Sequence, residues 1–142
     1  MLVIFRGVDH YITPSWYPTK QETGKVVPTW NYEAVHANGM ARVIQEPEWL
    51  LRHVSDVTDR FEASRDAPWA ASDTPDGFLD VMVRGIVGIE IAVTNIATKI
   101  KASQNRNDAD RMGVVEGLRT EDETPAHVMA DLVDRYREDD VK

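Results

Sequence analysis

The stretch VVPTWNYEAVHANGMARVI, residues 26–44, decides the fold class. Its first part is rich in β-branched and aromatic side chains, which favour strands. Asn38-Gly39 is a pair that readily supplies the positive φ angles of a tight hairpin turn. The stretch therefore predicts two antiparallel strands, residues 26–37 and 40–44, joined at Asn38-Gly39.

The residues before this stretch continue the extended pattern. Residues 2–6 have the composition of a buried strand, and residues 7–10 that of a turn. Residues 11–17 then predict an extended segment that ends at Pro18, because proline removes a ladder donor. The N-terminal third of the chain is thus predicted to be mainly β.

After Gln45 the apolar residues follow a helical period. A helix is predicted from Pro47, with one face formed by Trp49, Leu50, His53, Val54, Val57 and Phe61. A second helix has Asp73 or Thr74 as its cap, Pro75 in its first turn and a buried stripe of Phe78, Leu79, Met82, Val83 and Ile86.

Strand-like composition returns at residues 86–93 and 96–102. Two more helices are expected, from a cap at Asn107 through Leu118 and from Thr124 to Arg137. This order predicts an α+β domain, a small barrel or curled antiparallel sheet with helices packed outside.

Composition excludes several classes of function. Of the 142 residues 42% are hydrophobic, which suits one globular domain, and there is no cysteine for a disulfide, a thiolate nucleophile or a thiolate-bound metal. The net charge of -8 opposes nonspecific binding to nucleic acid. The apolar stretch of residues 2–5 is too short for a signal peptide, so a cytoplasmic protein is expected, with no metal site.

The common catalytic signatures are also missing. The sequence has no GxSxG elbow, no GxGxxG or Walker loop and no HExxH pair. No pair of carboxylates stands out as an acid and a base, and no catalytic residue is assigned. His36 lies in the predicted strand, where structural hydrogen bonding and proton transfer both stay open.

Two polar clusters remain, each at the end of an extended segment. In YITPSWYPTK, residues 11–20, hydroxyls and one cation suit a phosphate, and aromatic rings supply flat surface: Thr13, Ser15, Thr19 and Lys20, with Trp16, Tyr17 and nearby Trp30. In KASQNR, residues 101–106, cations, a hydroxyl and amides precede a helix start, where backbone N–H groups favour anions.

A ligand with a phosphate at one end and a planar heteroaromatic ring at the other would use both clusters. Flavin mononucleotide (FMN) has that form. A nucleotide or a peptide is an alternative ligand, and so is a purely structural role, in which the aromatic residues complete a core and the polar residues cap turns.

The wording of these motifs closely resembles the PaiB-like family, described as FMN-binding negative transcriptional regulators. The resemblance runs from about Val3 to Leu118 and includes YITPSWYPTK, VPTWNYEAVHANG, EPEWLL, TDRFE, IVGIEIAVTNI, KASQNR and ADRMGVVEGL. It implies an antiparallel FMN-binding split β-barrel, similar to that of the pyridoxamine phosphate oxidase and flavin reductase superfamily. It also implies a homodimer with flavin sites at the subunit interface.

The resemblance further implies which residues hold FMN. Ser15 and Lys20 become the phosphate ligands, with Thr13 beside them and the rings of Trp16 and Tyr17 close by. The TWNY motif places Trp30 and Asn31 near the site, and His36 is expected to face the partner subunit. The second cluster contributes Lys101, Ser103, Gln104 and Arg106.

The sequence also departs from the family pattern. Family members have several dozen residues before the strand matched by MLVIFRG, so we expect a barrel that is incomplete at its N-terminus, with residues 1–118 as the flavin-binding domain. Residues 119–142 are expected to be an acidic helical extension, with eight acidic and four basic side chains. The family likeness gives this extension no role.

Three functions follow as hypotheses. The first is an FMN-binding negative regulator of transcription, acting as a homodimer; direct contact with DNA is an option that the charge does not support. The second is an FMN-dependent oxidoreductase similar to flavin reductases, in which the flavin carries the redox chemistry. The third is a dimerisation or interaction module that binds no flavin.

Overall fold

The computed structural model describes residues 1–139, which form two compact units. The α2–α3 unit consists of Met1 and residues 39–94, and the α4–α5 unit of residues 2–38 and the chain from Asn95 onward.

A three-stranded sheet supplies strands to both units, with β1 (Leu2–Ile12), β2 (Thr29–Ile44) and β3 (Gly88–Lys101) in the order β1-β2-β3. β1 and β2 are antiparallel, from Leu2 opposite Asn38 to Ile12 opposite Thr29. Together with five α-helices in residues 1–139, the antiparallel sheet confirms the predicted mixed α+β class. Closure of the sheet into a split barrel stays a prediction.

The predicted hairpin at Asn38-Gly39 is wrong, because β2 runs through this pair without a turn. The glycines with positive φ in the described chain are Gly24 and Gly77, so Gly39 does not serve a left-handed turn. A β-carbon on Gly39 would lie 2.4 Å from the carbonyl oxygen of Ala92 in β3. Glycine is therefore required here for close approach of the neighbouring strand.

Two other predicted breaks in the sheet are also wrong. β1 continues through the turn expected at residues 7–10, and the extra residue is taken up as an irregularity between Arg6 and Asp9. This pattern is that of a β-bulge, which bends a strand without ending it. Likewise, the two strands expected at 86–93 and 96–102 are one strand, β3.

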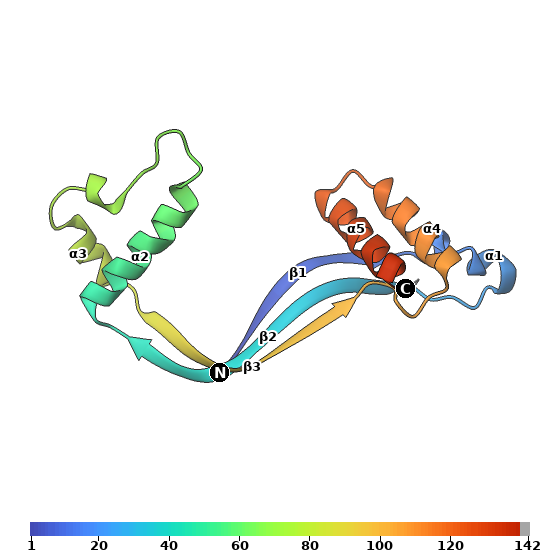
Figure 1. Ribbon diagram of the computed structural model, residues 1–142, viewed down its shortest axis with the longest axis horizontal. Coiled ribbons are helices and arrows are strands. Elements are labelled where there is room, and N and C mark those ends of the chain that lie inside the picture. The colour runs from blue at the N-terminus through green and yellow to red at the C-terminus, as the bar shows by residue number, and fades with distance from the viewer. Residues whose placement is uncertain (140–142) are drawn as a thin grey trace. The chain divides into compact units, whose positions relative to one another are not determined.

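The α4–α5 unit holds the larger core. α4 (Asp108–Arg119) and α5 (Thr124–Asp139) confirm the two predicted C-terminal helices and pack side by side (Figure 1). α5 also contacts β1. The core combines side chains from both halves of the chain: Ile12, Tyr17, Ala102, Val114, Val115, Leu118, Ala126, Met129, Ala130, Leu132 and Val133.

In the same unit, a short 3-10 helix, η1 (Pro14–Trp16), and α1 (Thr19–Thr23) follow β1. The prediction of an extended segment as far as Tyr17 is wrong at its end, because η1 replaces its last residues; α1 lies after that segment. Thr13 caps η1 by accepting a hydrogen bond from the Ser15 amide at 3.3 Å. The chain therefore turns before Tyr17, and this turn directs the Tyr17 ring into the core.

The α2–α3 unit contains α2 (Pro47–Glu62), the 3-10 helix η2 (Ala71–Asp73) and α3 (Phe78–Val83). α2 begins at Pro47 as predicted. α3 begins later than predicted, because Gly77 adopts a left-handed φ of 74° and is the N-cap in place of Asp73 or Thr74.

The stripe predicted to be buried on α3 is mostly exposed: Val83 is buried, whereas Phe78, Met82 and Ile86 are 49%, 49% and 43% exposed. No helix of residues 1–139 combines the length and the apolar composition needed to cross a bilayer.

Candidate functional site: a cationic cavity beside Tyr17

A cavity of about 150 Å³ lies in the α4–α5 unit, between the start of β2 and the loop that follows β3. It brings together residues of both polar clusters that the sequence singled out, although about 80 residues separate the two clusters in the chain. The cavity is lined by Tyr17, Val27, Pro28, Thr29, Asn31, Lys101, Ser103, Asn105 and Arg106.

Tyr17 forms one wall of the cavity and is 1% exposed. The guanidinium carbon of Arg106 lies 4.4 Å from the centre of the Tyr17 ring, in cation–π geometry. Burial raises the pKa of the Tyr17 phenol, and the positive charge of Arg106 and its hydrogen-bonding contact with the phenol partly oppose this rise. The phenol oxygen is buried, and no described residue meets it with full hydrogen-bond geometry, although the Arg106 guanidinium lies close to it.

Asn31 and Ser103 form the buried base of the site. The Asn31 Nδ2 donates a hydrogen bond to the Ser103 hydroxyl at 2.9 Å, and the two residues are 0% and 3% exposed. Ser103 has a φ of 60°, a left-handed conformation that costs a non-glycine residue energy. The Asn31 Oδ1 is buried without a partner among residues 1–139.

Two cations give the cavity its charge. The Lys101 ammonium donates to the Thr29 hydroxyl, which holds it at the edge of the cavity, and Arg106 lies over Tyr17. None of the lining residues is acidic. The buried Asp110 carboxylate lies behind Tyr17 and is not part of the lining. Cations in a lining without carboxylates favour an anionic ligand, and hydrogen bonds from them to a phosphate are among the strong ones.

Gln104 shapes the loop and does not line the cavity. Its Oε1 accepts from the Ala102 amide at 2.7 Å, and its Nε2 donates to the Ile100 carbonyl at 3.2 Å. The Arg106 amide then donates to the Ser103 carbonyl at 3.0 Å and closes the turn. The loop is therefore held by its own backbone and side chains before any ligand binds.

The N-terminus of α4 ties this loop to the segment after Tyr17. Asn107 caps α4 by accepting from the Asp110 amide at 2.8 Å, as the sequence predicted, and its Nδ2 donates to the Thr19 hydroxyl at 3.2 Å. The buried Asp110 carboxylate accepts from the Thr19 amide at 3.1 Å. These bonds hold the segment that carries Tyr17 next to the loop that carries Arg106.

The structure places the other residues of the first cluster elsewhere. The Lys20 ammonium donates to the Ser15 hydroxyl at 3.1 Å, and both side chains are exposed outside the cavity. Ser15 and Trp16 line a different, open hollow against α4, and Trp16 stacks on His10 with ring centres 6.4 Å apart. A part for Thr13, Ser15, Trp16 and Lys20 in ligand binding stays a prediction.

Trp30 and His36 lie on β2 and do not line the cavity either. Trp30 is 54% exposed and meets Tyr11 edge-on at 6.2 Å. Trp30 and Asn31 are consecutive residues of β2, and successive side chains of a strand point to opposite faces of the sheet. Trp30 therefore lies on the face opposite to that of Asn31. Their proposed contacts with a ligand or a partner subunit are also untested.

Sequence reasoning missed four lining residues: Val27, Pro28, Thr29 and Asn105. Two of them carried a signal. Thr29 begins the TWNY motif, and Asn105 lies inside KASQNR. Val27 and Pro28 carried none, because they line the cavity through the path of the chain before β2.

Comparison with known proteins gives a family match. A family model described as "Putative FMN-binding domain" matches residues 1–95. These residues include Tyr17 and Asn31 of the cavity, whereas Lys101, Ser103 and Arg106 lie beyond them.

Several relatives are also similar. A Bacillus subtilis protein named "Protease synthase and sporulation protein PAI 2" is 37% identical over 134 residues, which is 94% of this chain and 62% of the relative. An uncharacterized protein of Aspergillus fumigatus is 36% identical over 134 residues, or 83% of this chain and 51% of the relative. The chain thus spans between about half and two thirds of these two relatives.

Proposed function

The chain belongs to the FMN-binding family whose model it matches, and from this premise we propose that the cavity beside Tyr17 holds the phosphate end of FMN. The observation that carries the proposal is a lining with two cations, no carboxylate and two buried polar atoms without partners. Such atoms are rare in folded proteins and are commonly satisfied by a ligand or water.

The size of the cavity limits which part of FMN enters it. Ligand pockets for drug-sized molecules hold roughly 300 Å³ or more. The cavity of about 150 Å³ therefore fits the phosphate and the neighbouring part of the ribityl chain, and the flavin ring lies outside it. When bound, FMN would supply hydride or electron transfer, and this chain would bind and orient its phosphate.

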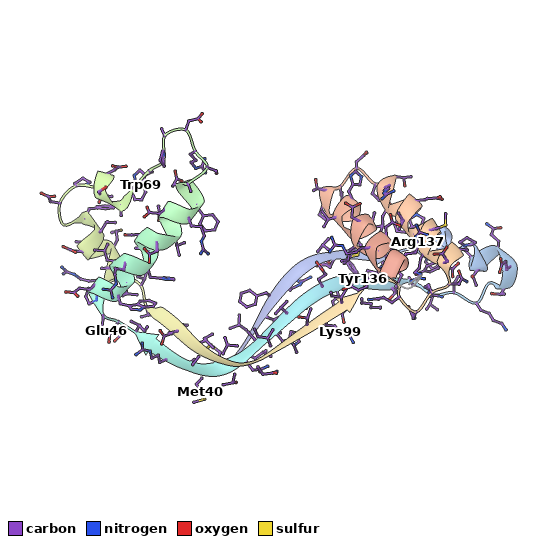
Figure 2. The ribbon with its side chains drawn as sticks, viewed as in Figure 1. Met40, Glu46, Trp69, Lys99, Tyr136 and Arg137 are labelled. Carbon is purple, nitrogen blue, oxygen red and sulfur yellow. The ribbon has the colours of Figure 1, made fainter. Side chains whose placement is uncertain are left out.

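Lysine substitutions test where the phosphate binds. Lys101→Ala is expected to weaken FMN binding by about 1.5 to 3 kcal/mol, the size of a hydrogen bond to a charged group. Lys99, which precedes Lys101 by two residues on β3 and is labelled in Figure 2, is exposed and outside the cavity, so Lys99→Ala is the matched control. Binding is measured from the visible absorbance and the quenching of flavin fluorescence.

A third variant separates the two polar clusters. If Lys20→Ala weakens binding and Lys101→Ala does not, the phosphate binds at the SWYPTK segment and the assignment to the cavity is wrong. If Lys99→Ala and Lys101→Ala weaken FMN binding equally, the loss reflects the net charge of the protein and not a contact between Lys101 and the phosphate. Protein that stays colourless with added FMN, and whose melting temperature does not rise, would remove FMN from the proposal altogether.

Regulation of transcription is the finer part of the proposal. The name of the B. subtilis relative ties that protein to protease synthesis and sporulation. We propose that this chain is an FMN-binding negative regulator in which flavin occupancy modulates repression. Mobility-shift assays on DNA upstream of its own gene, with and without FMN, test this. Protein that binds FMN and oxidises NADH with an electron acceptor, but does not bind DNA, would support an oxidoreductase instead.

A homodimer is proposed as the active form. In the described sheet, β1 and β3 are edge strands, and β1 carries exposed apolar side chains: Leu2, Ile4 and Phe5 are 50%, 51% and 60% exposed. Exposed edges with apolar side chains are normally paired or covered. Light scattering after size exclusion should give twice the chain mass of 16.1 kDa, and a monomer at micromolar concentration would contradict the proposal.

A further inference from the structure

We infer that the cavity beside Tyr17 recognises a phosphate ester that carries a neighbouring hydroxyl, whatever group lies beyond, so that small phosphorylated polyols compete with FMN. This inference rests on the proposed function, because it concerns the same cavity. It goes further by naming the class of competing ligand and the residues that select it.

The size of the cavity excludes most of a flavin. At about 150 Å³ it takes the charged end of a ligand but has no room for a ring system as well. The lining is polar at the base, with Asn31 and Ser103, and cationic at the edge, with Lys101 and Arg106. Recognition inside the cavity therefore depends on the phosphate and the atoms next to it, and not on the flavin ring.

The cavity offers both hydrogen-bond donors and a hydrogen-bond acceptor. Lys101 and Arg106 only donate, so they match the acceptor oxygens of a phosphate. Asn31 Oδ1 is an acceptor, buried and unpaired, and phosphate oxygens cannot satisfy it. A ligand hydroxyl next to the phosphate supplies the missing donor. The Tyr17 phenol, also buried and unpaired, can donate to the phosphate or accept from a hydroxyl.

The polar groups of the cavity are preorganised. The Asn31–Ser103 hydrogen bond fixes the amide of Asn31, a lining residue, so its free oxygen has one orientation before any ligand binds. Gln104 and the turn from Ser103 to Arg106 hold the loop with internal bonds. A site that is built before binding pays little ordering cost, and so it can bind a small ligand that makes few contacts.

A pair of ligands that differ only in hydroxyls tests the inference. Glycerol 3-phosphate carries a phosphate ester with neighbouring hydroxyls, and propyl phosphate lacks the hydroxyls. Each is titrated by calorimetry into the full chain, and each is used to displace FMN, with flavin fluorescence as the signal. Glycerol 3-phosphate is expected to bind and to release FMN, and propyl phosphate to bind between about 2- and 12-fold more weakly, the loss of one neutral hydrogen bond.

Variants identify the selecting atom. Asn31→Leu keeps the approximate volume and removes the acceptor, so the two phosphates should then bind equally. Because this variant also removes the bond to Ser103 and can unfold the base of the cavity, Ser103→Ala is the companion. It removes the same bond but keeps the Asn31 oxygen, so it should bind both phosphates more weakly through the loss of preorganisation and still prefer glycerol 3-phosphate.

The outcomes separate this inference from the proposed function. If the chain binds FMN, but glycerol 3-phosphate neither displaces FMN nor binds by itself, the inference is overturned and the proposed function stands. If the chain binds glycerol 3-phosphate but not FMN, the proposed function is overturned, and recognition of a hydroxyl-bearing phosphate ester by the cavity stands. Equal affinity for the two phosphates in the wild-type chain would overturn hydroxyl recognition by Asn31.

Discussion

Gly113 offers the sharpest test of how α4 positions the site. A β-carbon at this position would lie 2.0 Å from the carbonyl oxygen of Trp16 and 3.2 Å from the Cδ of Pro18. Both atoms belong to the segment that carries Tyr17 into the cavity. Gly113→Ala should therefore push this segment away from α4 and disturb both folding and ligand binding.

The magnitude follows from two opposing effects. Overpacking costs about 1 to 3 kcal/mol, and the upper half applies here because the nearest atom is main chain and cannot rotate away. Replacing glycine by alanine inside a helix recovers about 1 kcal/mol of helix propensity. We expect Gly113→Ala to lower the free energy of unfolding by about 1 to 2 kcal/mol.

Urea denaturation followed by circular dichroism measures this loss as a lower midpoint. Gly85→Ala is the control, because its β-carbon would come no closer than 3.4 Å to any neighbour. That variant should be neutral or gain up to about 1 kcal/mol through the unfolded state. If Gly113→Ala has the midpoint of the wild type or a higher one, α4 does not fix the Trp16–Tyr17 segment as described.

Three more variants follow from buried residues. Tyr17→Phe removes a buried hydroxyl that no described residue meets with full hydrogen-bond geometry, so it should keep or slightly raise the free energy of unfolding while weakening phosphate binding. The pKa of the Tyr17 phenol is raised in the folded state, so the unfolded chain loses this proton first as the pH rises. The free energy of unfolding of the wild type should therefore fall above about pH 10, and that of the variant should fall less. Met129→Ala should cost about 2 to 5 kcal/mol, whereas exposed Val128→Ala should stay within about 0.5 kcal/mol in the same urea titration. Ser103→Gly should be about 1 kcal/mol more stable than Ser103→Ala, because glycine accepts a φ of 60° without strain; equal midpoints would show that the loop relaxes.

Helices were predictable where a local signal marks the end. Asn107 caps α4, Pro47 opens α2, and α5 begins at Thr124 with Pro125 in its first turn. Each signal acts within one helical turn, so the sequence alone contains it. The start of α3 was missed because Gly77 offered no cap side chain, and its left-handed conformation was not anticipated.

The hairpin prediction failed because a contact between distant residues outweighed a local signal. Asn38-Gly39 is a strong local turn signal, but Gly39 is required by the close approach of Ala92 in β3, more than 50 residues away. A glycine that allows a turn and a glycine that allows contact look alike in a sequence. Only the pairing of β2 with β3 distinguishes them.

The candidate site was predictable in its residue types more than in its grouping. Both polar clusters were recognised from the sequence. Their residues do not all gather at one cavity, because the η1 turn leaves Lys20 and Ser15 outside the cavity beside Tyr17, and the assignment of the phosphate to these two residues stays a prediction. The alternation of side chains between the two faces of a strand predicts that Trp30 and Asn31 lie on opposite faces of β2, so they could have been separated from the sequence. The approach of Tyr17 to Arg106 depends on the bonds between Asn107, Asp110 and Thr19, and no local pattern shows these.

Several locally unfavourable features meet at the cavity beside Tyr17, and they support the proposal that it binds a ligand. Ser103 adopts a left-handed φ, which the described chain otherwise reserves for Gly24 and Gly77. Tyr17 and Asn31 each bury a polar atom that no described residue satisfies. Selection for stability alone would favour glycine at 103 and phenylalanine at 17, since both changes remove a cost. That these costs coincide within one cationic cavity is expected if a ligand compensates for them, because binding sites are where proteins depart from the rules of stable folding.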